Sequence, residues 1–334
     1  QAFYATPSTF VVSAQLPSTV TSVANLFTYS QYDSSAILDW DTSQVQDFSF
    51  MFNSSSFNQP IGNWNMASAT SLSGMFQSVS IKGLFNQDIS SWDVSKVTNF
   101  SYMFRSSHSQ GNSFNQPIGS WNLSSATNLL SMFEGASSFN QSLNSWNVSN
   151  VSNFGSLFRR YSSSSQSMTF NQPLSSWNTA KGSSFSSMFQ DNAAFNQDLS
   201  SWNTARGSNF SNMFSGATNF NNGETYVSSS PGTKPLSWDM SSATTIGSMF
   251  SGATKFNQSV SGWNLASADV AMNSSTSLTN VFNGATGFNN GFARGISGVM
   301  DWTLPKYGAN KNLIGIFQNA SSFNQDISSW DLWY

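Results

Sequence analysis

The strongest constraint on this chain is an internal repeat that tryptophan marks. A Phe usually lies seven residues before the tryptophan of each unit, and an aromatic residue follows 12 residues after each of the first eight. A unit of about 25 residues is too short to bury its own apolar side chains, so neighbouring units must stack on one another. The sequence therefore predicts a solenoid rather than separate globular domains. The units are marked by Trp40, Trp64, Trp92, Trp121, Trp146, Trp177, Trp202, Trp238, Trp263, Trp302 and Trp330.

Two patterns of apolar spacing follow each other within one unit. The segment 89–94 has the alternation of a strand, with Trp92 facing inward beside aliphatic residues. The segment 97–104 has helical spacing, with Ser95 as its N-cap. We therefore expect right-handed coils, about eleven in all, each made of a short parallel β-strand and a short helix or 3₁₀ turn.

The repeat also predicts the domain boundaries and the loops. Residues 1–25 lack the repeat and are expected to form an N-terminal cap or extension, whereas residues 26–334 form a single solenoid. Extra residues that interrupt the period are expected in surface loops, where insertions cost little. These insertions are 78–84, 105–113, 159–169, 223–234, 269–277 and 291–298.

Composition excludes several classes of function. Only 8% of the residues are charged, 38% are hydrophobic, and the net charge is −3, so the chain can bury a core and has no basic field for nucleic acid. Cysteine is absent and His108 is the one histidine, so we expect no disulfide, no metal site and no cofactor. No apolar run is long enough for a membrane span. We interpret the start at Gln1 as the end of a removed leader.

Three segments of the chain carry a family resemblance. They read FNQDISSWDVSKVTNF at 85–100, MFEGASSFNQ at 132–141 and FQNASSFNQDISSWD at 317–331. These motifs resemble the 25–26-residue BspA-like repeats of bacterial surface lipoproteins, which are leucine-rich-repeat-like, over roughly residues 26–333. The resemblance implies a secreted or cell-surface protein that mediates adhesion, and it brings no catalytic residues. The chain departs from the pattern because Asn replaces Asp after most of the tryptophans.

The residue after each tryptophan is expected to point outward, because the tryptophan itself is expected in the core rather than on a sugar-binding platform. Together these residues predict a flat, polar, weakly charged face. That face is either a binding surface for a glycan or protein, or a solvated or assembly surface. Its members are Asp41, Asn65, Asp93, Asn122, Asn147, Asn178, Asn203, Asp239 and Asn264, with Thr303 and Asp331 at the C-terminal end.

Charged residues provide weaker alternatives. Asp39 and Asp41 flank Trp40, and Asp93 lies two coils away, about 10 Å at strand spacing. Neither a catalytic pair of carboxylates nor a calcium site is favoured by this placement. His108 and the segment 159–161 lie in expected loops, as solvated residues or as a partner contact.

Asn-x-Ser/Thr motifs are frequent and are candidate glycosylation sites in a secreted protein. Two of them, Asn140 and Asn257, belong to the Phe-Asn turn and should be protected. The remaining candidates are Asn53, Asn99, Asn122, Asn147, Asn150, Asn209, Asn273 and Asn319.

Taken alone, the sequence favours a non-enzymatic extracellular structural protein that self-associates through solenoid ends or faces into a fibre or coat. The low charge gives little repulsion between copies. Trp333 and Tyr334 lie outside the repeat register and are candidate assembly contacts. The alternative is an adhesin or glycan-binding module that uses the polar face.

Overall fold

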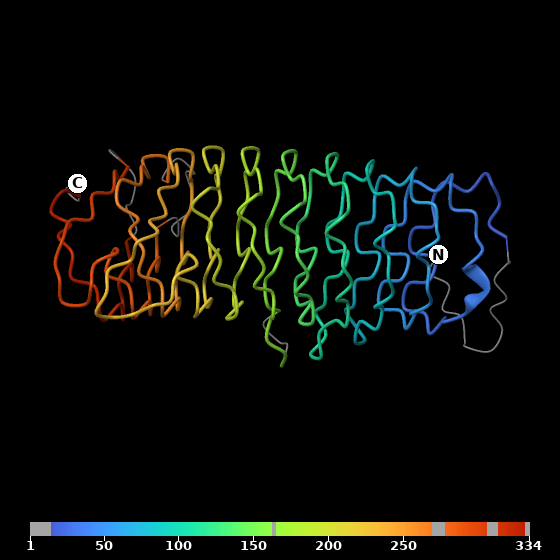
Figure 1. The fold of residues 1–334 in the computed structure, drawn as a ribbon, viewed down its shortest axis with the longest axis horizontal. Helices are drawn as coiled ribbons and strands as arrows, with labels where there is room; N and C mark the ends of the chain where they lie inside the picture. The colour runs from blue at the N-terminus through green and yellow to red at the C-terminus, as the bar shows by residue number, and fades with distance from the viewer. Residues whose placement is uncertain (1–14, 162–164, 269–277, 306–312, 331–334) are drawn as a thin grey trace.

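The computed structural model describes residues 15–161, 165–268, 278–305 and 313–330. The chain forms a stack of similar coils along one long axis, with the first and last described coils at opposite ends of the stack (Figure 1). The one helix among the described residues is the 3₁₀ helix η1, Ser35–Ile37. The repeat protein that the sequence predicts is therefore present as a continuous stack.

Consecutive coils are joined by isolated parallel β-bridges, and most of these bridges form one column along the stack. This bridge column lies seven residues after each tryptophan rather than at the tryptophan. The strand expected around Trp92 is not formed, and the segment 97–104 is not a helix. The bridge column consists of Ser22, Asp47, Ser71, Asn99, Asn128, Asn153, Ser184, Asn209 and Thr245.

A run of turns explains why helical apolar spacing appears without a helix. Every second N–H in the segment 48–54 donates to a carbonyl of the next coil, as Phe50 does to Ser73 at 2.8 Å. The N–H groups of Met51 and Asn53 donate to the carbonyl three residues back, as Met51 does to Phe48 at 3.2 Å, and the N–H of Ser49 donates to Oδ1 of Asp47. Phe50 has a φ of 56°, in the left-handed region. Side chains still return to the interior at short intervals, so the apolar pattern imitates a helix.

Aromatic rings fill the interior in continuous columns. The tryptophans of the repeat, from Trp40 to Trp330, are buried and form the tryptophan column, as the sequence predicts. Ring centroids are 6.2 to 6.4 Å apart in five of the neighbouring pairs, and closer in the last two pairs, at 5.8 Å and 5.3 Å. From Trp64 onward, each indole N–H in the column also donates to a backbone carbonyl of the preceding coil, as Trp146 does to Ile118 at 2.9 Å. Stacking and hydrogen bonding therefore both tie each coil to its neighbour.

The coils are further apart at the tryptophans than near the bridge column. Phe154 and Phe185, close to the bridge column, have centroids 5.3 Å apart, whereas Trp146 and Trp177 are 6.4 Å apart. Backbone pairing requires strands about 4.8 Å apart, and the wider ring spacing at the tryptophans accompanies the absence of a bridge beside most of them in the described ranges. Where the tryptophan column tightens to 5.8 Å, between Trp263 and Trp302, a bridge does form beside it.

The aliphatic residue three positions before tryptophan is buried in most coils, but in one coil it is exposed. Val299 is 52% exposed, and Met300 takes its place in the core with no exposure. The carbonyl of Met300 accepts the indole hydrogen bond of Trp330 at 2.6 Å. Val299 stands three residues before Trp302, where the repeat has a buried aliphatic residue, but the insertion before it shifts the register by one residue.

Three insertions stack on one another beside the regular coils. Single bridges join Ser78 to Ser106 and Gly83 to Asn112. The N–H of Ser165 donates to the carbonyl of Ser109 at 3.0 Å. We call 78–84, 105–113 and the described part of 159–169 the insertion ridge, which extends beyond the outline of the coils (Figure 1). Further along, the insertions 223–234 and 291–298 also meet, and 269–277 lies outside the described residues.

The described part of the first 25 residues already contributes to the stack. Leu16 and Val20 pack against the core, and the N–H of Val23 donates to the carbonyl of Asp47 at 3.0 Å. The coil pattern thus begins a few residues before position 26. Within the described ranges, the structure contains no helix with the length and apolar character needed to cross a membrane.

Glycines at the turns allow a direct test of this backbone. Gly135 has a φ of 69°, and a Cβ there would overlap the carbonyl oxygen of Ser106. Gly252 has a φ of 70°, but the nearest atom to a Cβ would be 3.7 Å away. We expect Gly252→Ala to lower the free energy of unfolding by about 1 kcal/mol. Gly135→Ala should lower it by about 1–3 kcal/mol more than Gly252→Ala does. Urea unfolding of both variants measures the difference, and equal losses would contradict the contact at Gly135.

Candidate functional site

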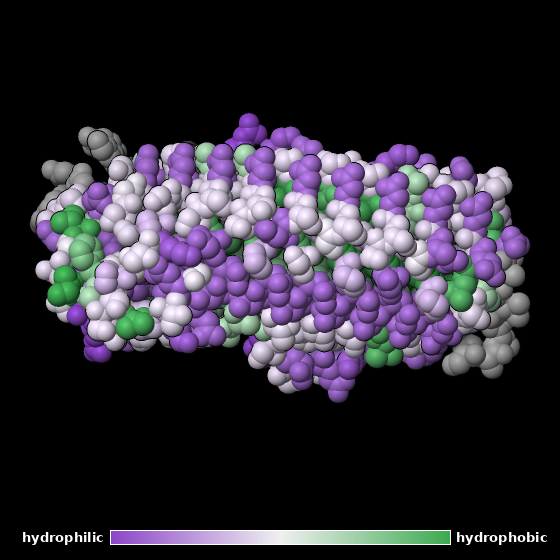
Figure 2. Space-filling view, in the orientation of Figure 1, coloured by the Kyte–Doolittle hydropathy of each residue, from purple (hydrophilic) through white to green (hydrophobic). Residues whose placement is uncertain are grey.

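The predicted polar face is formed and follows the tryptophan column on its outside. Its members are exposed because each one directly follows a buried tryptophan and so points the opposite way. Polar side chains recur in rows along the long axis of the molecule (Figure 2). We call the following residues the asparagine row: Asp41, Asn65, Asp93, Asn122, Asn147, Asn178, Asn203, Asp239 and Asn264.

Side chains of the asparagine row are held by hydrogen bonds to their own backbone. The Oδ1 atom of each accepts the N–H two residues later, at 3.0 Å for Asn122 and 3.2 Å for Asn147 and Asn178. This local turn fixes the direction of the amide. The described residues provide no partner for the Nδ2 groups of these three asparagines. Oriented amide donors therefore face outward at successive coils.

The carboxylates of the asparagine row are held in the ionised form. Hydrogen bonds from the side chain and backbone of Ser43 lower the pKa of Asp41. Ser95 lowers the pKa of Asp93 in the same way, and Ser241 lowers the pKa of Asp239. A general acid needs the opposite shift. These groups therefore present fixed negative charge rather than a proton donor.

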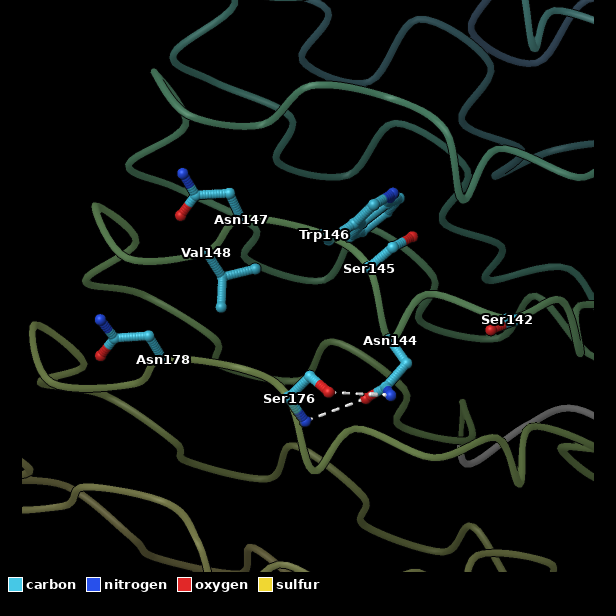
Figure 3. A pocket seen from close by; sticks show the side chains of 8 residues that line it. All are labelled: Ser142, Asn144, Ser145, Trp146, Asn147, Val148, Ser176 and Asn178. Atoms are coloured by element: carbon cyan, nitrogen blue, oxygen red, sulfur yellow. Dashed lines mark hydrogen bonds between the residues drawn. The ribbon is translucent and has the colours of Figure 1, made fainter.

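A hollow of about 590 Å³ opens in the asparagine row between the coils of Trp146 and Trp177. Figure 3 shows Asn147 and Asn178 projecting from equivalent positions of the two coils, with the Trp146 ring turned to the interior. The other lining residues are Ser142, Asn144, Ser145, Val148 and Ser176. All of the lining groups are uncharged.

Asn144 braces the hollow and was not singled out by the sequence pattern. Its Nδ2 donates to the Ser176 hydroxyl at 3.0 Å, and its Oδ1 accepts the Ser176 N–H at 3.0 Å (Figure 3). The equivalent positions two residues before tryptophan hold Gly119 and Ser175 in the adjacent coils. An asparagine where the neighbouring units have a small residue is the sequence signal that could have identified this position.

A second polar cluster lies beside the insertion ridge. Glu134, which is buried, accepts hydrogen bonds from Arg105 and Arg159, one from each neighbouring coil. The sequence pattern placed Arg159 in a loop and missed Glu134. The three residues share one position, 13 residues after a tryptophan, and charges of alternating sign at one repeat position are the signal that identifies them.

The other candidate residues from the sequence lie at separate places in the structure. Asp39 is exposed beside Trp40, and His108 lies in the insertion ridge, where its Nδ1 accepts the N–H of Gln110 at 3.2 Å. Trp333 and Tyr334 lie outside the described residues, as does Asp331. Across the described ranges no three His, Cys, Asp or Glu side chains gather as metal ligands would.

The candidate glycosylation sites differ in accessibility. Asn53 is only 8% exposed, so its candidacy is wrong for the folded chain, because the run of turns directs it inward. Asn140 and Asn257 are protected as predicted, since their Oδ1 atoms accept backbone N–H groups of the next coil. The exposed candidates are Asn122, Asn147 and Asn319; Asn99, Asn150 and Asn209 are half-buried and hydrogen-bonded, and Asn273 lies outside the described residues.

Comparison with known proteins identifies the repeat. A family model described as "Mycoplasma protein of unknown function, DUF285" matches the chain at residues 8–110, 79–169, 164–233 and 233–333. No curated protein and no solved structure matches the chain. Four successive matches of one model agree with the tandem repeat read from the tryptophan spacing. The chain therefore belongs to the DUF285 family and is a tandem-repeat protein throughout most of its length.

Proposed function

We propose that this protein is a non-enzymatic extracellular binding module that recognises a neutral glycan through the asparagine row. The observation that supports this most is the hollow beside Asn147 and Asn178, whose lining consists mainly of amides and hydroxyls, with Trp146 and Val148, and has no charged group. Sugars present hydroxyl groups that pair with such donors and acceptors. The secreted or cell-surface location that the BspA-like resemblance implies belongs to the same proposal.

Rigidity of the asparagine row also favours binding. The amides are oriented by hydrogen bonds to the backbone, and the backbone is fixed by a core of stacked rings. A ligand therefore meets donors that lose little side-chain freedom on binding. The row repeats along the stack, so a polymer with a regular repeat can contact several coils at once.

Direct binding to neutral polysaccharides tests the proposal. We expect saturable binding to at least one member of a panel of soluble neutral glycans. Asn147→Tyr combined with Asn178→Tyr should weaken it about tenfold or more, because the bulky rings fill the hollow and remove two amide donors. Ser228→Tyr combined with Ser229→Tyr is the control, because these two exposed residues lie outside the asparagine row, and the affinity of this variant should be unchanged. Absence of binding across the panel, or equal loss in the control, would contradict the proposal.

Self-association into a fibre or coat is the second candidate. Ile296 and Val299 are 53% and 52% exposed, respectively, near the C-terminal end of the stack. Figure 2 shows apolar surface at this end. Exposed apolar patches of this kind favour contact between copies. Sedimentation at micromolar concentration should show oligomers that Ile296→Ser with Val299→Ser disrupts, and monomers of the unmodified chain would contradict this candidate.

A further inference from the structure

The insertion ridge carries an unusual concentration of charge for this chain. Only 27 of the 334 residues are charged, counting 12 Lys and Arg with 15 Asp and Glu. Four cations nevertheless lie along the ridge or the coils beneath it: Lys82, Arg105, Arg159 and Arg160. Two carboxylates, Glu134 and Asp191, are near them, so this region has an excess of positive charge in a chain whose net charge is −3.

Buried Glu134 fixes two of the arginines in place. Its carboxylate lies 2.8 Å from Nε of Arg105 and 3.3 Å from an Nη atom of Arg159. One carboxylate thus holds two guanidinium groups and neutralises only one of them. The Nε of Arg159 is buried without a partner among the described residues. The pair is therefore organised before any ligand arrives and keeps a positive charge.

Tyrosine rings lie beside these guanidinium groups. The Arg105 guanidinium carbon is 5.5 Å from the centroid of the Tyr161 ring and 5.8 Å from that of Tyr102. Both rings are partly exposed. A cation beside a flat aromatic face suits a ring-shaped ligand that also carries an anionic group.

Backbone pairing arranges the cations along successive coils. Ser78 pairs with Ser106, and the N–H of Ser106 donates to the carbonyl of Glu134 at 2.7 Å. The N–H of Gly135 then donates to the carbonyl of Arg159 at 2.8 Å. Arg105 and the Arg159–Arg160 pair therefore lie on either side of the coil of Glu134, whereas Lys82 is next to Gly83, which pairs with Asn112 further along the insertion ridge. Cations spread over several coils favour an extended polymer over a compact ligand.

Asp191 reduces this positive field only in part. It occupies the position of Arg160 in the next coil, 14 residues after a tryptophan. Burial raises the pKa of the Asp191 carboxyl, although Arg160 and Arg159 act in the opposite direction. Its negative charge is therefore held less firmly than that of an exposed aspartate.

We propose that the insertion ridge binds an acidic polysaccharide, whose sulfate or carboxylate groups pair with Arg159, Arg160 and Lys82 while a sugar ring lies against Tyr161. This surface is at a different position of the repeat from the asparagine row, and the two proposals are independent. The ridge supplies the charge that the asparagine row lacks.

Retention of the full chain on immobilised dextran sulfate tests the proposal. We expect retention at low ionic strength that falls steeply with added salt, because exposed ion pairs are screened. Lys82→Gln with Arg160→Gln should weaken binding about tenfold, while Glu134 and its two arginines remain intact. Lys181→Gln with Lys255→Gln makes the same change in net charge outside the ridge and should bind as the unmodified chain does.

Further probes separate the classes of ligand. Polygalacturonate should also bind, and neutral dextran should not bind at the ridge. No retention on either acidic polysaccharide, equal loss in both double variants, or stronger binding to poly-glutamate than to the polysaccharides would overturn the proposal. Binding of a neutral glycan to the asparagine row should be the same in the ridge variant, so failure of one proposal is distinguishable from failure of the other.

Discussion

Replacing Trp146 by alanine should lower the free energy of unfolding by about 3–5 kcal/mol. The ring lies between its neighbours in the tryptophan column and has a centroid 6.4 Å from that of Trp177. Truncation leaves a cavity inside the stack and removes the indole hydrogen bond to Ile118. Because each coil is stabilised only by its neighbours, the loss should also divide unfolding into separate transitions of the two halves. Urea unfolding followed by circular dichroism measures both effects.

The adjacent exposed residue provides the matched control. Asn147→Ala removes one local hydrogen bond on the outer side of the same coil. This substitution should lower the free energy of unfolding by about 1 kcal/mol or less, and the chain should still unfold in a single transition. Similar losses for the two variants would mean that the indole is not a core residue.

Removing the acceptor of Asn140 should give the second large effect, about 2–3 kcal/mol. Its Oδ1 accepts the backbone N–H of Asn171 at 2.9 Å and the Nε2 of Gln172 at 3.2 Å. Asn140→Leu keeps the size of the side chain but leaves the two donors without that acceptor. The same unfolding experiment measures the cost.

Asn122→Leu is the control for this substitution. Asn122 is exposed, and its Oδ1 serves only its own turn. The change should cost less than about 1 kcal/mol, because water replaces the lost partner. If Asn140→Leu lowers the free energy of unfolding as little as the control does, the turn asparagines do not hold neighbouring coils together.

The interior of this protein was predictable from the sequence, whereas the path of the backbone was not. Regular spacing of Trp92, Trp121 and Trp146 specifies stacked units, because no single unit can bury its own rings. The run of turns depends instead on positive φ angles at Phe50 and Tyr102, 56° and 61°. Neither Phe nor Tyr favours that conformation, so the run of turns could not be predicted from the conformational preferences of these residues.

Polar sites were predictable to different degrees. The asparagine row followed from its position next to buried tryptophans, and it is exposed as expected. The hollow depends on the spacing of two coils and on the pairing of Asn144 with Ser176, which no local motif encodes. Arg105, Glu134 and Arg159 could have been aligned by counting from each tryptophan. The leucine-rich-repeat character of the coils and their handedness stay predictions.

Acrylamide quenching of tryptophan fluorescence tests the central claim most directly, because it reports which indoles solvent can reach. Rings stacked on one another inside the molecule, with amides and hydroxyls outside, should leave nearly all of the emission unquenched until the chain unfolds. Quenching of most of the emission in the native protein, at the rate seen for free tryptophan, would show that the rings line a solvent-filled groove and would contradict the account.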